Sequence, residues 1–488
     1  MTNRADASSS PFDLVDIPGV GRFLRWRHSR VALQLPLMLV AMLMVWDGLV
    51  GPQLAPKNLA TVLTWVHYRG LVVLALLVAG NLFCMACPFM LVRNLARRLV
   101  QPTRMWPSRL RGKWLALLLF ALMLYLYELL DLWADPALTA WLILLYFASA
   151  MLVDMLFRGA AFCKYLCPLG QFNFVSSLIS PFEVRVRASP ACTQCSTKDC
   201  IKGRPGSEPG SAAANLRGCE LWLFQQRKAG NMDCTFCLDC LHACPYANVG
   251  ITSRLPASEL WTDPWRSGIG RFSRRPDLAA LVVVFTFGAL LNAFAMVSPV
   301  YTLESWLASL LDTGSEALVL AVIFFAGLVV LPAALLGLAG WLSRWWVGSS
   351  RRPSIGAWVT RYAFSMVPLG FSVWLAHYSF HFLTGFWTFV PVAQSLVADV
   401  LGWPLLGGPH WELGSLLPMG WLYPLELGFL GLGWFGSLLV LYRLAARNES
   451  GSPWRAFLPW AGLITLLFLA AIWLMGQPME MRGTFLAG

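Results

Sequence analysis

The cysteines are the residues of this sequence whose type and spacing could do chemistry. There are twelve, and all of them stand in close-set groups. Disulfide frameworks belong mainly to small exported domains, whereas close-set cysteines in a segment that stays inside the cell favour metal binding or redox thiols. The groups are Cys84 and Cys87; Cys163 and Cys167; Cys192, Cys195, Cys200 and Cys219; and Cys234, Cys237, Cys240 and Cys244.

The last group has the strongest pattern, with spacers of two, two and three residues and Pro245 after the fourth cysteine. It matches the bacterial ferredoxin run, in which three thiolates hold one [4Fe–4S] cluster and the fourth reaches a second cluster. The upstream group is looser, because four residues separate Cys195 from Cys200. One intact cluster beside a degenerate or zinc-binding site is therefore an alternative. The two-cluster arrangement predicts one cluster on Cys192, Cys195, Cys200 and Cys244, and a second on Cys219, Cys234, Cys237 and Cys240.

Two further cysteine pairs each precede a proline, in Cys84-x2-Cys87-Pro88 and Cys163-x3-Cys167-Pro168. Each pair stands at the expected cytoplasmic end of a membrane span, and proline suits a helix end because it cannot continue the hydrogen-bond ladder. Four thiolates on one membrane face could meet and hold a third cluster. Thiol–disulfide pairs and reduced structural cysteines are the alternatives.

The composition indicates that most of the chain lies in lipid. Of 488 residues, 57% are hydrophobic and 13% are charged, whereas soluble domains are about a quarter charged. We expect a mainly α membrane protein with about nine transmembrane helices, and a small cytoplasmic α+β insertion of the bacterial two-cluster ferredoxin type. The expected spans lie near 32–50, 68–87, 114–134, 137–157, 278–298, 317–342, 358–383, 420–442 and 456–475.

The basic residues predict the orientation. Seven of them and no acidic residue stand between the second and third spans, and such loops face the cytoplasm. We expect a bacterial inner-membrane protein whose C-terminus lies outside. The expected parts are a cytoplasmic leader at 1–31, a four-helix membrane domain at 32–157, a cytoplasmic segment at 158–277 with the ferredoxin domain at about 183–256, and a five-helix membrane domain at 278–488.

The motifs together resemble a known family. Two Cys-Pro motifs on membrane helices, followed by a two-cluster segment, resemble the membrane-bound polyferredoxins of the NosR and NapH type, over roughly residues 68–256. The cupric-reductase assembly factors of cytochrome oxidase have similar parts. The resemblance implies that the eight cysteines from Cys192 to Cys244 hold clusters and that the four membrane-end cysteines are redox-linked. It also implies electron transfer between a quinol pool or a cytoplasmic donor and a partner across the membrane.

Histidines gather on the expected outer side, at His67, His377, His381 and His410. His377 and His381 stand four residues apart and share one helix face, so they could bind haem or copper. Hydrogen bonding within an aromatic-rich interface is the plainer alternative. Cuprous copper also accepts soft sulfur ligands, although such methionines more often pack at an interface. The candidates are Met475, Met479 and Met481.

Polar residues inside expected spans are functional candidates because lipid does not favour them. Glu128 and Asp131 stand three apart on one helical face and could take up protons from quinol oxidation. Placement at a helix end near the interface is the alternative. The other members of this set are Asp47, Asp154 and Glu426.

Two functions follow. The first is electron transfer between membrane quinol or a cytoplasmic ferredoxin-like donor and a periplasmic acceptor. The 158–277 segment has 15 basic and 9 acidic residues, a net charge of +6, which would attract an acidic carrier. The second is an assembly factor that reduces copper or a thiol. Membrane lipid is an expected partner and nucleic acid is not, because no recognition motif accompanies the net charge of +12.

Overall fold

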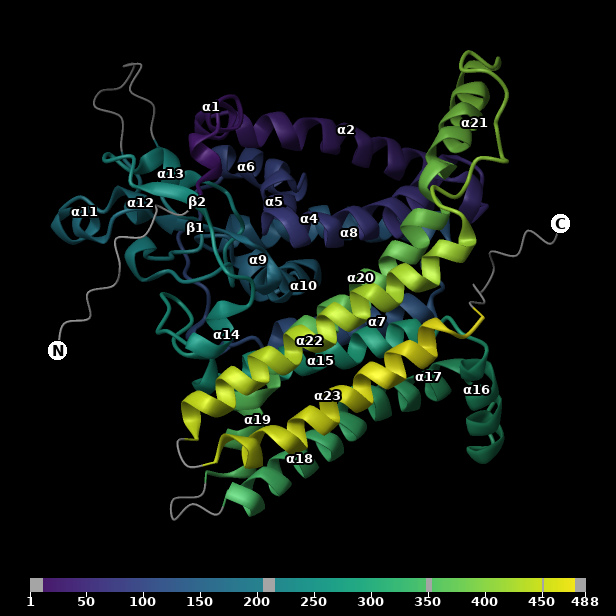
Figure 1. The fold of residues 1–488 in the computed structure, drawn as a ribbon. Helices are drawn as coiled ribbons and strands as arrows, with labels where there is room; N and C mark the ends of the chain where they lie inside the picture. Colours follow the sequence, from purple (N-terminus) through teal and green to yellow (C-terminus); the bar gives the residue numbers. More distant parts are fainter. Residues whose placement is uncertain (1–11, 205–215, 348–352, 450–451, 479–488) are drawn as a thin grey trace, which may run out of the picture.

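A computed structural model of the chain describes residues 12–204, 216–347, 353–449 and 452–478. These residues form mainly helices, with one two-stranded sheet. The long helices run side by side, and the sheet gathers with short helices at one end of the bundle (Figure 1). The helices α16 (Pro299–Leu310) and α21 (Phe389–Leu401) lie at the opposite end.

Seven helices among the described residues are long and apolar enough to cross a membrane. The chain is therefore a multi-pass membrane protein. The helices are α2 (Ser29–Val50), the run Leu59–Ala79 that ends in α4 (Arg69–Ala79), α8 (Pro136–Leu156), α15 (Pro276–Phe294), the run Glu316–Val347 of α17 (Glu316–Phe325), η8 (Ala326–Val330) and α18 (Leu331–Val347), the run Met419–Asn448 that contains α22 (Leu422–Asn448), and α23 (Pro453–Met475).

The other two of the nine expected spans are shorter or interrupted. The expected span at 114–134 is α7 (Trp114–Leu129), a helix of 16 residues. The expected span at 358–383 is divided into α19 (Ile355–Tyr362), the 3₁₀ turn η9 (Ala363–Met366) and α20 (Val367–Thr384). Because α20 is buried along almost its whole length, protein rather than lipid surrounds it.

Buried apolar side chains of α15 and α20 form the centre of the largest core. The helix α20 packs against α22, α15 and α4. Small residues allow this approach, since a Cβ at Gly433 would overlap Ser372 and a Cβ at Gly370 would overlap Thr286. The helix α20 therefore packs closely against α22 and α15.

The segment between α8 and α15 contains short elements around the sheet. Strands β1 (Phe182–Val186) and β2 (Val249–Ser253) pair antiparallel, from Phe182 opposite Ser253 to Val186 opposite Val249. The Asp13 side chain accepts a hydrogen bond from the Ile251 amide at 3.0 Å, so the N-terminal segment also packs here. The short helices are α9 (Ala161–Tyr165), α10 (Pro168–Ser176), α11 (Ser189–Gln194), α12 (Asp199–Lys202), α13 (Asp239–Ala243) and α14 (Ser258–Thr262).

Candidate redox centres

The four membrane-end cysteines line one cavity of about 350 Å³. Two separate segments of the chain contribute these cysteines to the cavity lining. After α4 ends at Gly80, which has φ +63°, α5 (Leu82–Ala86) carries Cys84 and ends at Cys87. Cys163 lies on α9, and Cys167 caps the N-terminus of α10. The two Cys-Pro motifs are therefore adjacent in space, as a shared redox centre requires. The remaining lining is mainly apolar and aromatic.

Hydrogen-bond donors surround these sulfurs. The Gly170 amide donates to Cys167 Sγ at 3.2 Å, and Asn173 Nδ2 donates to Cys84 Sγ at 3.3 Å. Cys163 Sγ lies 3.3 Å from the sulfur of Met90. N–H groups that point at sulfur stabilise the charge of a thiolate and tune the potential of any cluster it holds.

The cysteines of the first predicted cluster line a smaller cavity, of about 20 Å³, in the sheet-containing segment. We call them the exposed group because their side chains are partly accessible to solvent. Asn248 connects two of them: its side-chain Nδ2 donates to Cys192 Sγ at 3.3 Å, and its backbone N–H donates to Cys244 Sγ at 3.4 Å. The members of the exposed group are Cys192, Cys195, Cys200 and Cys244.

The cysteines of the second predicted cluster are all buried, and we call them the buried group. Burial raises the pKa of the Cys219 thiol to about 11, and Cys234 raises it further. Burial also raises the pKa of Cys240, with Cys219 and Cys234 as the next contributions. Burial raises the pKa of Cys237, and Cys219 contributes there too. Cys219, Cys234 and Cys240 also pack in one buried core cluster, and metal binding would have to displace the protons of these thiols.

The two groups share a local backbone feature. Lys198, with φ +53°, caps α12, which carries Cys200. Leu238, with φ +60°, caps α13, which carries Cys240. Each left-handed residue stands two positions before the third cysteine of its run. The longer spacer before Cys200 is thus accommodated without losing this turn.

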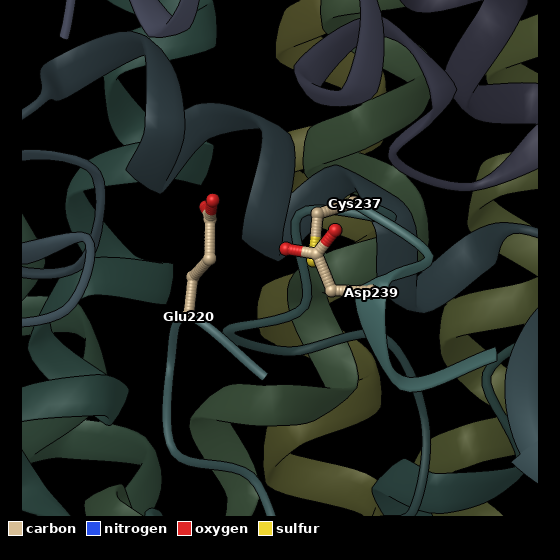
Figure 2. Close-up of side chains that lie close together, drawn as sticks. All are labelled: Glu220, Cys237 and Asp239. Atoms are coloured by element: carbon tan, nitrogen blue, oxygen red, sulfur yellow. The ribbon is translucent and has the colours of Figure 1, made fainter. Parts of the chain in front are cut away.

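Figure 2 shows Cys237 of the buried group with two carboxylates, Glu220 and Asp239; the ligand atoms of the three side chains lie within 4.8 Å of one another. This set has the composition of a cation site. However, Arg30 Nη1 lies 3.0 Å from Glu220 Oε1 and 3.7 Å from Asp239 Oδ2. A guanidinium therefore already balances these carboxylates. Burial would raise the pKa of Glu220, but Arg30 and Arg93 hold it well below its ordinary value.

Sequence reasoning missed this ion cluster. The available signal was that Glu220 directly follows Cys219 and Asp239 directly precedes Cys240. Burial, followed by the neighbouring Glu220, raises the pKa of Asp239 to about 7. The two arginines of this ion cluster, Arg30 and Arg93, come from distant parts of the chain, so no local sequence pattern could reveal them.

The two histidines on α20 are buried, with ring centroids 4.9 Å apart and planes at 86°. Within the part of the chain that the structure describes, His377 Nδ1 and Nε2 and His381 Nε2 have no hydrogen-bond partner. The other two candidates have ordinary partners. His67 is within 3.1 Å of the Val62 carbonyl oxygen, and exposed His410 pairs with Glu412 at 2.8 Å.

Several polar candidates in the spans have structural partners. Asp47 accepts a hydrogen bond from the Leu59 amide at 2.6 Å. Asp154 accepts one from the Phe162 amide at 3.0 Å and faces Arg93. The remaining buried carboxylates include Glu128, 3.5 Å from Asn292 Nδ2, and Glu426. Asp131 has a left-handed backbone at the end of α7, with φ +42°.

The expected methionine ligands do not form a described group. Met475 is buried in the apolar core at the end of α23. Met479 and Met481 lie outside the described residues.

The comparisons with known proteins gave one informative relative. Over 100 residues the chain is 32% identical to the Escherichia coli (strain K12) protein named "Putative electron transport protein YccM". The match covers 20% of this chain and 24% of that protein. No protein-family model and no solved structure matches. This similarity and the seven membrane-type helices support an electron-transfer membrane protein.

Proposed function

We propose that this chain is an electron-transfer protein of the NosR and NapH polyferredoxin type, which passes electrons through two [4Fe–4S] clusters. The observation that carries the proposal is that the membrane-end cysteines line one cavity and the exposed group lines another, while Cys219, Cys234 and Cys240 of the buried group pack in one core cluster. A [4Fe–4S] cluster takes four thiolates. One cluster would bind to the exposed group and the second to the buried group.

The third group supports a third redox centre at the membrane ends. The cavity of about 350 Å³ has room for a bound group at its cysteine end. A thiol–disulfide pair needs two cysteines, whereas here Cys84, Cys87, Cys163 and Cys167 all border the same space. The arrangement therefore favours a third cluster over two separate redox thiol pairs.

The same cavity supports exchange with a quinol pool. Its lining also includes apolar side chains of α2 and α8, together with Tyr68, Arg69 and Tyr146. Apolar pockets with a few polar groups are typical sites for flat organic cofactors. A quinol bound there would lie beside the third centre, so electrons would pass between quinol and the membrane-end cysteines.

The exposed group supports exchange with a soluble carrier on the cytoplasmic side. Its cysteines are partly exposed, unlike those of the buried group. The 158–277 segment around it carries a net charge of +6, which attracts acidic, ferredoxin-like partners. The proposed path of electrons runs from the soluble carrier through the exposed group, the buried group and the membrane-end group to the quinol pool. A periplasmic acceptor would be a further partner of this inner-membrane protein.

The alternative function is an assembly factor that acts as a copper or thiol reductase. The observation that favours it is the buried pair His377 and His381, whose three nitrogens without hydrogen-bond partners in the described part of the chain would suit copper or haem. A purified protein that binds copper only when both histidines are present would support this function.

Reduction followed by quinone addition tests the main proposal. Reduced acidic ferredoxin should bleach the iron–sulfur absorption of the purified full-length protein, and a short-chain quinone should restore it. Cys195→Ser should block the first step and Cys167→Ser the second. Bleaching that quinone does not reverse, while a copper salt does, would contradict the quinol-linked relay and favour the reductase.

A further inference from the structure

A buried ion network lies between the buried group and the membrane-end group. It consists of Arg30 on α2, Arg93 on α6 (Phe89–Leu99), Asp154 on α8, and Glu220 and Asp239 from the sheet-containing segment. None of these side chains has a role in the relay described above. We call this set the arginine network.

The contacts of the network are short and directional. Both terminal nitrogens of Arg30 donate to the Glu220 carboxylate, at 3.0 and 3.3 Å. Arg93 Nη2 donates to the same carboxylate at 2.7 Å, and its Nη1 lies 3.4 Å from Asp154 Oδ2. Glu220 is thus shared by two guanidinium groups.

Four of these five charged side chains are largely removed from water, and the Asp239 side chain is 16% exposed. The side chains of Arg93 and Asp154 have no exposed surface, and those of Arg30 and Glu220 are 9% and 5% exposed. Charges in such surroundings interact strongly because little solvent screens them. Their field therefore extends to whatever the adjacent sulfurs hold.

The network touches the cysteine-bearing segments on both sides. Glu220 and Asp239 are sequence neighbours of Cys219 and Cys240, and both carboxylates lie within 4.8 Å of Cys237 Sγ. On the membrane side, Asp154 accepts a hydrogen bond from the Phe162 amide, next to Cys163.

Carboxylates this close to a cluster ligand would disfavour the addition of an electron, because reduction adds negative charge beside them. The two guanidinium groups offset that repulsion. We propose that Arg30 and Arg93 are positioning residues that set the reduction potential of the redox centre on Cys219, Cys234, Cys237 and Cys240. This inference rests on the proposed function, since it requires that the buried group holds a cluster.

An electron paramagnetic resonance titration of the full-length protein tests the inference. Arg30→Gln removes a positive charge, so the buried centre becomes harder to reduce, by at least tenfold in its one-electron equilibrium, which is 59 mV. Glu220→Gln removes a negative charge and shifts the same centre at least tenfold in the opposite direction. A purely structural role predicts no such opposite signs.

Controls assign the effect to the buried centre. A water-soluble paramagnetic relaxing agent broadens the signal of the exposed group first and so identifies it. The one-electron equilibrium constant of that exposed centre should change by less than twofold in both variants. Arg30→Lys keeps the positive charge, so the one-electron equilibrium constant of its buried centre should stay within threefold of the wild-type value. The matched variant Arg25→Gln removes an arginine that is 53% exposed and paired with Asp16, and it leaves both potentials within twofold.

The outcomes separate this inference from the proposed function. If the purified wild-type protein contained no iron, the proposed function itself would be refuted. Iron-loaded variants whose buried centre keeps its potential, or shifts in the same direction in Arg30→Gln and Glu220→Gln, would overturn only the role of the arginine network. If Arg30→Gln yields no folded protein, Glu220→Gln decides alone: an upward shift supports the inference, and no shift or a downward shift overturns it.

Discussion

The exposed group and the buried group each consist of four cysteines, and each includes a short helix, but their surroundings differ. Neutral amides, from Asn248 and the Lys198 backbone, surround sulfurs of the exposed group. Carboxylates and arginines surround the buried group. Net charge, hydrogen bonds and solvent exposure set cluster potentials. Under the proposed function, one ligand pattern would be used twice, once for exchange with a soluble carrier and once for transfer toward the membrane.

Loss of a ligand should separate the two groups most strongly. Cys237→Ser should remove about four of the irons and abolish electron transfer to quinone, because the buried group is the middle of the proposed relay. Cys195→Ser should also remove about four irons, but quinol should still reduce the buried group. Metal analysis and quinol-driven bleaching measure both. Equal behaviour of the two variants in bleaching would contradict the linear order.

Breaking the arginine network should have the next largest effect, on stability. Arg93→Ala removes the buried ion-pair partner of Asp154 and leaves Glu220 paired with Arg30 alone, and an uncompensated buried charge costs about 3–5 kcal/mol. Exposed Arg25→Ala should cost about 0–1 kcal/mol. Thermal unfolding in detergent compares them. Similar melting temperatures of the two variants would show that the network does not hold the segment on the membrane helices.

Ionic strength should affect one end of the relay only. Raising salt from about 0.05 to 0.5 M shortens the Debye length, so reduction by an acidic carrier should slow by about tenfold. Reoxidation by quinone should not change, because the cavity of the membrane-end group is mainly apolar. Stopped-flow absorbance follows both steps. A salt-independent reaction with the carrier would exclude electrostatic docking at the exposed group.

Single hydrogen bonds to sulfur should have the smallest effect. Asn248→Ala removes the donor to Cys192 Sγ, and Asn173→Ala removes the donor to Cys84 Sγ. Each bond contributes about 1 kcal/mol, so each variant should lower the potential of its own centre and leave the other centres unchanged. Redox titration of the two variants side by side checks this. A shift of the buried group in either variant would contradict the separation of the centres.

Local patterns predicted much of the site but less of the fold. The cysteine spacing predicted the set Cys192, Cys195, Cys200 and Cys244, which lines one cavity, because short spacers confine most of these sulfurs to one loop; the assignment of clusters to cysteines stays a prediction. The division of the expected span at 358–383 by η9 could not be foreseen, since the apolar sequence of α20 suits a buried helix as well as a membrane span. The Arg30–Glu220 pair joins residues 190 positions apart, so only the folded structure reveals it.

The outer-side residues show the same limit. His377 and His381 were expected on one helix face, and they are adjacent and buried. Their neighbours depend on how α20 packs against other helices, which the helical period does not specify. Metal or haem binding at this pair therefore stays a prediction.

Iron and acid-labile sulfide per purified chain test the central claim most directly. Two clusters require about eight irons, and a third at the membrane ends requires about twelve. Cys84→Ser should lower twelve to about eight and leave the exposed and buried signals in place. A wild-type value of about four or fewer, or zinc in place of iron, would contradict the proposal that the exposed and buried groups both hold clusters.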